Sequence, residues 1–245
     1  MSEALPASAA DDFPRRVTPE ILDELPASDP RAQRSRGDLR RINRITAAVT
    51  WLERGLTMAA AEKRPRTVVE LGAGDGTLAL RLSRSLGNPW LGTHLTLLDL
   101  EPSVAQQTAD AIRACGWTLE VVAADALDWL ERARPERVGV VLANLFVHHF
   151  EGERLARLLG GIGANADAFV CCEPRRSRVA LAGSRLLGLI GCNDVTRHDA
   201  VVSVRAGFRD DEIGVAWRDA VAGPWTLKET RAGAFSHLFV ARRDD

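Results

Sequence analysis

Residues 68–82 of this 245-residue chain carry the side chains whose types and spacing best suit chemistry. An apolar run ends in Glu70, and Gly72, Gly74 and Gly76 follow at a spacing of two. Glycines let the chain turn sharply and let a ligand approach the main chain where a Cβ would collide. The helix-like pattern after them would begin with free N–H groups and a partial positive charge. This order predicts a nucleotide-type ligand at the edge of a parallel sheet.

The spacing of the glycines separates two classes of ligand. A dinucleotide motif is G-x-G-x-x-G, whereas here the third glycine comes one position early and Thr77 stands in its place. Glu70 precedes the first glycine, where it would repel a pyrophosphate and accept hydrogen bonds from a cationic or amino-bearing ligand. The remaining strand ends must therefore decide between a dinucleotide and S-adenosylmethionine.

Three further polar residues follow predicted strands at the edge where open α/β sheets bind ligands. Asp99 suits the two ribose hydroxyls of an adenosine, because a carboxylate accepts two hydrogen bonds at once. Asp125, with small neighbours, would accept from the adenine amine. For both acids, capping the next helix is the alternative role. Asn144 would hold the methionine part of the cofactor.

The segments ELGAGDG, LLDLEP, AADALDWL and ANLFVHHF occur in the order and spacing of a known family. The chain from about residue 66 to 243 resembles the class I S-adenosylmethionine-dependent methyltransferases. ANLFVHHF, residues 196–208 and DLRRIN (residues 38–43) resemble the branch that includes quinone and polyketide methyltransferases, in which an N-terminal helix folds over the cofactor. The resemblance implies a doubly wound, Rossmann-like α/β fold: a mainly parallel seven-stranded sheet with an antiparallel last strand.

The resemblance also implies the cofactor, S-adenosylmethionine, with S-adenosylhomocysteine as the product. An arginine of the N-terminal helix would pair with the cofactor carboxylate, or else belong to a solvated helix face. The expected cofactor-binding residues are Glu70, Gly72, Ala73, Gly74, Gly76, Asp99, Leu100, Asp125, Ala126, Asn144 and Arg44.

Hydrophobic periodicity predicts the elements that position these residues. Strands are expected at 67–71, 94–99, 118–123, 138–144 and 168–173, with a helix in each gap. A final antiparallel hairpin, 225–231 and 235–242, turns at Gly233. Helices are expected at 35–61, with Ser35 or Asp38 as N-cap, at 177–190 and near 209–219, with a connection between the last two. The predicted organisation is an N-terminal extension (1–34, its first dozen residues disordered), a helical lid (35–64) and a methyltransferase domain (65–245).

A phenol or enol must lose a proton before it accepts a methyl group, and histidine is the natural base near neutral pH. His198 ranks first, because it lies in the long connection that would build the acceptor pocket, beside Asp199. His149 ranks second and His148 third, since both follow the fourth strand. A histidine in a pocket can equally be a hydrogen-bonding wall residue. The apolar run at 181–191 predicts a pocket for an apolar acceptor, or an ordinary buried helix.

The composition of the whole chain argues against several kinds of binding partner. A formal net charge of −1 argues against a nucleic-acid surface. Four cysteines without a C-x-x-C pair, and no histidine at metal spacing, predict no metal site. The acidic N-terminus lacks the apolar core of a signal peptide, and no apolar run approaches the roughly 20 residues of a membrane span. We therefore expect a cytoplasmic protein with no membrane partner; a homodimer is one option.

The predicted function is methyl transfer to a small, largely apolar acceptor in secondary metabolism. The favoured position is a phenolic or enolic oxygen of a polyketide- or quinone-like compound, and a ring carbon is the closest alternative. Two other classes stay open: an NAD(P)-dependent oxidoreductase, and a non-catalytic cofactor-binding partner. The absence of tyrosine, and so of a Tyr-x-x-x-Lys pair, weighs against the oxidoreductase.

Overall fold

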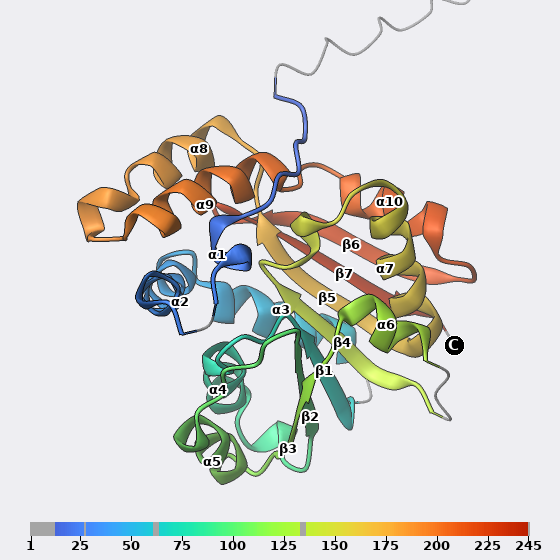
Figure 1. The fold of residues 1–245 in the computed structure, drawn as a ribbon. Helices are drawn as coiled ribbons and strands as arrows, with labels where there is room; N and C mark the ends of the chain where they lie inside the picture. Colours follow the sequence, from blue (N-terminus) through green and yellow to red (C-terminus); the bar gives the residue numbers. More distant parts are fainter. Residues whose placement is uncertain (1–12, 27, 61–63, 133–135, 245) are drawn as a thin grey trace, which may run out of the picture.

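The computed structural model describes residues 13–26, 28–60, 64–132 and 136–244. Its centre is a seven-stranded sheet in the order β3-β2-β1-β4-β5-β7-β6 (Figure 1). The last strand of the chain, β7, is antiparallel to both of its neighbours, and the pairs among β1 to β5 are parallel. This confirms the predicted fold class. The strands are β1 (Thr67–Leu71), β2 (His94–Asp99), β3 (Thr118–Ala123), β4 (Val138–Asn144), β5 (Ala166–Pro174), β6 (Trp225–Ala232) and β7 (Ser236–Arg243).

Helices cover both faces of the sheet and one of its edges. On one face lie α3 (Ala48–Ala60), α4 (Thr77–Leu86) and α5 (Gln106–Ala114), and on the other α6 (Ala126–Glu131), α7 (Gly152–Asn165) and α10 (Glu212–Ala220) (Figure 1). A further group lies beyond the carboxyl ends of the central strands: α1 (Ile21–Glu24), α2 (Pro30–Ile45), α8 (Arg178–Arg185) and α9 (Asp194–Ala206). Three short 3-10 helices complete the chain: η1 (Asn88–Trp90), η2 (Val147–His149) and η3 (Leu187–Ile190).

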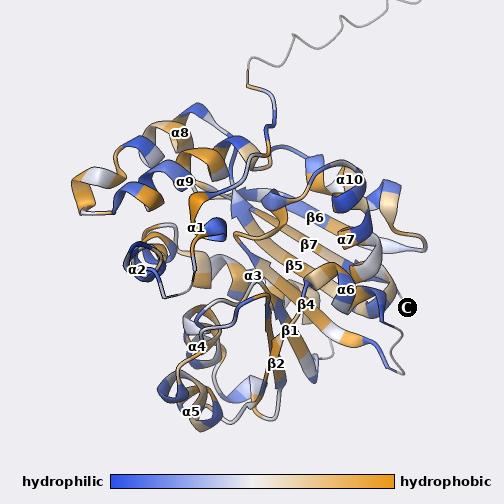
Figure 2. Cartoon of the chain, viewed as in Figure 1, coloured by the Kyte–Doolittle hydropathy of each residue, from blue (hydrophilic) through white to orange (hydrophobic). Residues whose placement is uncertain are grey.

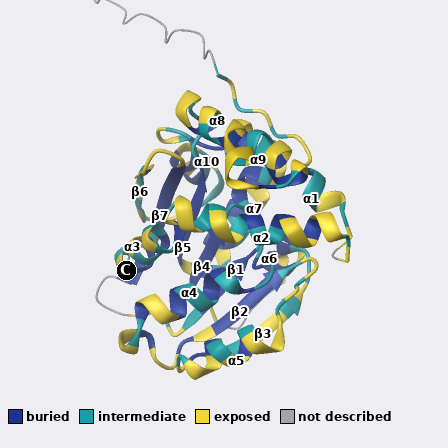
Figure 3. Ribbon diagram, turned by 90° about the vertical axis from the view of Figure 1, so that its left-hand side faces the viewer, coloured by how far each residue is buried: buried dark blue, intermediate teal, exposed yellow. Residues whose placement is uncertain are grey.

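The central strands are apolar on both sides, as strands covered by helices on each face must be. Successive side chains alternate between the faces: Val140 and Leu142 of β4 pack toward α3 and α4, whereas Val141 packs toward α6 and α7. Figure 3 shows the buried sheet between helices with exposed outer faces, and Figure 2 shows the same segregation as hydropathy. Burial of one such side chain stabilises the fold by about 1.5–3 kcal/mol, so the strand ends are held firmly.

The N-terminal helical region differs from its prediction. Instead of one helix over 35–61, α2 begins at Pro30, and Asp29 caps it by accepting from the N–H of Arg31 at 2.7 Å. An aspartate followed by proline is a strong start signal for a helix, and it outweighs Ser35 and Asp38. Those two predicted N-caps are wrong: both residues are buried inside α2. The turn at Ala47, with φ of 54°, separates α2 from α3.

The expected connection before the last helix is also wrong, because residues 194–206 form α9. Asn193 caps this helix by accepting from the N–H of Thr196 at 2.8 Å. Its buried face includes the polar residues Thr196 and Asp199. The hydrophobic periodicity of the sequence therefore does not predict this helix. The other predicted strands and helices lie within a few residues of their observed bounds. The predicted disorder of the first dozen residues lies outside the described residues, and no described helix is long and apolar enough to cross a membrane.

Candidate functional site

The glycine turn after β1 forms one wall of a cavity of about 150 Å³. All three glycines have left-handed backbone angles, with φ of 70° at Gly72, 55° at Gly74 and 69° at Gly76. A Cβ on Gly72 would lie 2.5 Å from the ring of Phe146, whereas one on Gly74 would enter open space. Sterics therefore require glycine at the first position, and the second leaves the main chain open toward a ligand.

The floor of this cavity carries two buried oxygen atoms without a hydrogen-bond partner among the described residues. These are Glu70 Oε2, at the end of β1, and Asn144 Oδ1, at the end of β4. Burial, together with the smaller effects of the charges of Asp75 and Asp99, raises the pKa of Glu70 to about 8. Two unpartnered acceptors side by side fit a ligand that brings several N–H donors.

The opposite wall of the same cavity comes from α2. Arg36, Leu39, Arg40 and Asn43 line it, and Arg40 pairs with Asp75 of the glycine turn at 2.7 Å. Arg44, the predicted arginine, is exposed and does not line the cavity. The reason is helical phase: Arg36 and Arg40 are one turn apart and share a face with Asn43, from which Arg44 is rotated away.

The acids at the next two strand ends bind main-chain groups. Asp99 accepts from the N–H of Gly74 at 2.8 Å and from that of Glu101 at 2.9 Å, so it braces the glycine turn. It caps no helix, since α5 begins only at Gln106. Asp125 is the N-cap of α6, where it accepts from the N–H groups of the second and third residues that follow. Leu100 is exposed beside Asp99, and Ala126 is buried in the first turn of α6.

A second cavity, of about 270 Å³ and mostly apolar, adjoins the first. The two cavities share Leu39 of α2 and Leu145, the residue directly after β4. Leu145 has a φ of 53°, a backbone conformation that a branched residue rarely adopts. The other walls of the apolar cavity come mainly from α2, α8, η3, α9 and the turn between β6 and β7. The apolar lining residues are Leu22, Leu39, Ile42, Ile45, Leu145, Pro174, Ala180, Leu186, Leu187, Ile190, Ala200, Val204 and Phe235.

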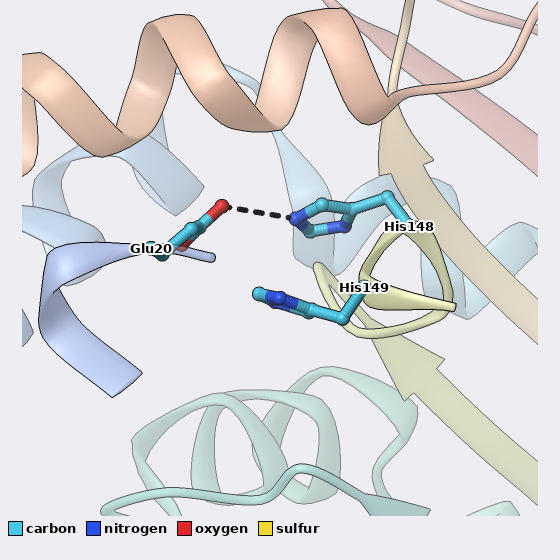
Figure 4. Close-up of side chains that lie close together, drawn as sticks. All are labelled: Glu20, His148 and His149. Atoms are coloured by element: carbon cyan, nitrogen blue, oxygen red, sulfur yellow. Dashed lines mark hydrogen bonds and ion pairs between the residues drawn. The ribbon is translucent and has the colours of Figure 1, made fainter. Parts of the chain in front are cut away.

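One polar residue of the apolar cavity, Glu20, belongs to a chain of three ionised groups. Glu20 lies 3.3 Å from His148 Nε2 (Figure 4), and His148 Nδ1 lies 2.7 Å from Glu173 Oε2. Glu173 also accepts from the N–H groups of residues 146, 147 and 148. Burial alone lowers the pKa of His148, but its hydrogen bonds to Glu173 and Glu20 outweigh burial and raise it to about 9. His148 is therefore an imidazolium at neutral pH.

None of the three predicted bases lines either cavity. His149 stacks beside His148, with ring centroids 4.2 Å apart. Burial and the charge of His148 lower the pKa of His149 to about 4, so it is neutral. His198 lies on α9 with 53% of its side chain exposed, 3.0 Å from Asp199. The face of α9 toward the cavity carries Asp199 and Ser203 instead, because the predicted connection is a helix and its phase turns His198 outward.

Comparison with known proteins identifies the domain around the glycine turn. Residues 68–164 match the family model described as a methyltransferase domain. These residues belong to a methyltransferase domain. No curated protein sequence matches it. Solved structures with the same fold include an O-methyltransferase family protein from Burkholderia thailandensis, with a TM-score of 0.59 and 21% identity over 89% of this chain.

Two other solved structures share the fold. The plantazolicin methyltransferase BpumL in complex with S-adenosylhomocysteine has a TM-score of 0.61 and 12% identity, covering 89% of this chain and 92% of that one. The pyocyanin biosynthetic protein PhzM has a TM-score of 0.55 and 20% identity over 89% of this chain. The chain spans 61% of the Burkholderia protein and 60% of PhzM.

A methyltransferase domain implies S-adenosylmethionine as the methyl donor, and the cavity beside the glycine turn fits its amino-acid end. The unpartnered oxygens of Glu70 and Asn144 would accept from an ammonium group. On the opposite wall, Arg36 and Arg40, which also pairs with Asp75, would supply donors for a carboxylate. Glu70, Gly72, Ala73, Gly74 and Asn144 were predicted as cofactor-binding residues from the sequence, and all five line this cavity.

Sequence reasoning missed two residues of the ionised chain. Glu173 lies near the end of β5, as Glu70 lies near the end of β1. An acid at the end of a predicted strand could therefore have identified Glu173 as a site residue. Glu20 lies in an Ala- and Pro-rich segment with no periodicity, and only the folded chain brings it to His148. The ligand atoms of Glu20, His148 and His149 lie within 4.8 Å of one another. The hydrogen bonds of His148 to carboxylates at both ring nitrogens mark this group as an ion-paired imidazolium.

Proposed function

We propose that this domain methylates a small, largely apolar acceptor at a phenolic or enolic oxygen. The supporting observation is that a cofactor cavity and an apolar cavity share two wall residues, Leu39 and Leu145. An acceptor in the apolar cavity would meet the methyl donor across that shared wall. A volume of about 270 Å³ suits a small ring compound.

S-adenosylmethionine brings an already activated methyl group, so the protein residues must mainly align the acceptor and exclude water. Apolar side chains from α2, α8, η3 and α9 surround the acceptor cavity. Holding two reactants in line can lower a barrier by roughly 7–11 kcal/mol. We propose that α2 is the lid over both cavities, because it lines each of them. This reduces the predicted lid at 35–64 to its first part, since α3 packs on a face of the sheet.

The acceptor hydroxyl must also lose its proton, and Glu20 is placed to take it. Burial raises the pKa of Glu20, but its hydrogen bond and ion pair with His148 outweigh burial and hold it below 4.5. Glu20 is therefore a carboxylate at neutral pH, facing the cavity with the His148 imidazolium behind it. The proton would pass from the acceptor oxygen to a Glu20 oxygen. The charge of His148 would favour the oxygen anion that remains.

Binding and turnover test this function separately. Calorimetry should show binding of S-adenosylhomocysteine and no binding of NADH; the reverse result would contradict the methyltransferase assignment. Turnover is measured as S-adenosylhomocysteine release over a panel of phenolic and enolic ring compounds. If only compounds with a nucleophilic ring carbon and no hydroxyl are methylated, the oxygen acceptor is wrong.

Glu20→Gln tests the proton acceptor. We expect turnover to fall by about 10²-fold or more, the range of general-base effects, with unchanged affinity for S-adenosylhomocysteine. Glu24→Gln is the matched control, since Glu24 is an exposed glutamate of the same short helix. Equal turnover in the two variants would show that Glu20 is not the proton acceptor.

A further inference from the structure

Exposed apolar side chains concentrate at the mouth of the apolar cavity. Ten large apolar residues remain exposed in the described part of the chain. Six of them belong to the end of α2, to α8 with η3, and to the β6–β7 turn. We call these six the mouth surface: Ile45, Val179, Leu186, Leu189, Ile190 and Phe235. Such a concentration, unlike scattered exposed residues, marks an interaction site.

The mouth surface is continuous with the interior of the cavity. Ile45, Leu186, Ile190 and Phe235 each line the cavity and are also exposed. Leu189 is 83% exposed at the end of η3, and Figure 1 places α8 and the turn after it at an outer edge of the molecule. An apolar path therefore leads from the outside of α8 and η3 to the acceptor cavity.

The elements around this mouth are strongly basic, although the whole chain has a formal net charge of −1. Helix α2 contains six arginines and one acid, Asp38, which is buried and bonded to Arg41. Arg31 and Arg40 pair with Asp29 and Asp75, which lie outside the helix, and Arg34 and Arg44 are exposed. The segment 178–190 contains two arginines and no acid. Arg41 donates to the main chain of Ile190 at 3.3 Å, and the Arg197 side chain lies against Gly188. The exposed acids near them are Asp194, in the first turn of α9, and Asp23 and Glu24 of α1.

We propose that the mouth surface docks on an anionic lipid surface. Leu186, Leu189 and Ile190 would enter the boundary between headgroups and acyl chains, and the surrounding arginines would pair with lipid phosphates. Their stems can lie along apolar surface while the guanidinium groups stay at the phosphates. An acceptor dissolved in the bilayer would then reach the cavity without crossing water; this last step rests on the proposed function, whereas the docking does not.

The residue types favour lipid over an acidic protein as the occupant. Five of the six members of the mouth surface are aliphatic, whereas energetically dominant residues of protein interfaces are enriched in Trp, Tyr and Arg, with Leu and Val under-represented. The expectation of no membrane partner follows from the absence of an apolar run long enough to span a bilayer. That criterion does not address arginines and exposed aliphatic residues that come together only in the folded chain.

Vesicle binding of the full chain tests the proposal. The probes are vesicles of phosphatidylcholine alone and of phosphatidylcholine with phosphatidylglycerol at about three to one. We expect sedimentation with the mixed vesicles, at least about tenfold weaker binding to the neutral ones, and loss of binding at high salt, as screening of arginine–phosphate attraction requires. Binding to neither vesicle, or equally to both, overturns the proposal.

A matched pair of exposed substitutions places the contact. Leu189→Asp should lower binding to the mixed vesicles by about tenfold or more, because it puts a charge into the headgroup boundary. Val215→Asp is the control, since Val215 is 44% exposed on α10, away from the mouth; it should bind as the parent does. Thermal unfolding checks that both variants fold. Equal effects of the two variants contradict the assigned face.

Light scattering distinguishes lipid from a second copy of the chain. A dimer that Leu189→Asp converts to monomers, without vesicle binding by the parent, would assign the mouth surface to self-association and overturn the lipid proposal. These outcomes are independent of methyl transfer. Failure of vesicle binding leaves S-adenosylhomocysteine binding untouched, and failure of S-adenosylhomocysteine binding leaves the vesicle result untouched.

Discussion

The two cavities differ in how the chain builds them. The cofactor cavity has the main chain of one glycine turn as a wall and side chains at the ends of β1 and β4 as its floor, with side chains of α2 opposite. The apolar cavity is made from side chains of α2, α8, η3 and α9, which are far apart in sequence. A wall formed by main chain allows few substitutions, whereas side chains that form a wall can shift to make room. We therefore expect one added methyl group to disturb the cofactor cavity, and the apolar cavity to tolerate one.

The largest effect is expected at Glu173, which supports the loop between the two cavities. Glu173→Ala removes the partner of the His148 imidazolium and leaves three main-chain N–H groups without their acceptor. Breaking a buried ion pair from one side destabilises a fold by about 3–5 kcal/mol. We expect a loss of that size in the free energy of unfolding, measured by urea denaturation.

Glu131→Ala is the control for this substitution. Glu131 pairs with Arg157 on the surface, where an ion pair contributes about 0–1 kcal/mol. Similar losses in the two variants would mean that Glu173 does not hold the loop.

The second prediction compares one added methyl group on each side. Gly74→Ala places a Cβ in the cofactor cavity at a φ of 55°, and an L residue there is strained by roughly 1–2 kcal/mol. We expect about a tenfold or greater loss of affinity for S-adenosylhomocysteine in calorimetry. Gly183→Ala lies in α8, where the new Cβ meets the partly exposed ring of Phe235 at 2.7 Å. That ring can move, so the affinity should not change; an equal loss in both variants would refute the contrast.

The same difference explains what the sequence predicts and what it does not. Gly72, Gly74, Glu70 and Asn144 come from strand ends, whose position follows from the alternation of strands and helices. The mainly parallel seven-stranded sheet and its reversed last strand, β7, are predicted as well; the order of the strands in the sheet is seen only in the folded chain. A residue at the carboxyl end of a parallel strand lies at the edge of the sheet where ligands bind, so the local sequence pattern is enough to predict its place.

The acceptor side depends on contacts that no local pattern records. Glu20 meets His148 across 128 positions of sequence, and the phase of α9 turns Asp199 inward and His198 outward. The apolar run at 181–191 does line a cavity, through Gly183, Ser184, Leu186, Leu187 and Ile190. Its apolar residues indicated a pocket, but which element opposes it, and with what polar groups, is decided by tertiary packing.

The third prediction concerns the proton on Glu70. Its pKa is about 8 in the folded chain against 4.5 as the ordinary value, so the protonated form is favoured by folding. The stability from this group is full below about pH 4.5 and is lost as the pH rises through 8. Relative to Glu70→Gln, whose amide does not titrate, the parent should lose stability between these pH values. Thermal unfolding across that range measures it, and a constant difference would contradict the raised pKa.

Cofactor binding should reverse the protonation of Glu70. At pH 7 the group carries a proton, and an ammonium group beside it favours the carboxylate. We expect S-adenosylhomocysteine to release about one proton on binding, seen as different calorimetric enthalpies in Tris and phosphate buffers. Glu70→Gln should bind about tenfold or more weakly, since it loses a charge-assisted hydrogen bond, and its enthalpy should not depend on the buffer. Buffer-independent enthalpy in the parent would place the ammonium group elsewhere.

The smallest effect is expected at His198, which sequence analysis ranks first as the base. Its side chain is half exposed and turned away from both cavities. Its neighbour Asp199 keeps two other hydrogen bonds, from the N–H groups of Ile21 and Leu22, both at 2.9 Å. His198→Ala should therefore change stability by no more than about 0.5 kcal/mol and leave turnover within a factor of two or three. A 10²-fold loss of turnover with intact S-adenosylhomocysteine binding would return His198 to the reaction, and would mean that α9 rotates when the acceptor binds.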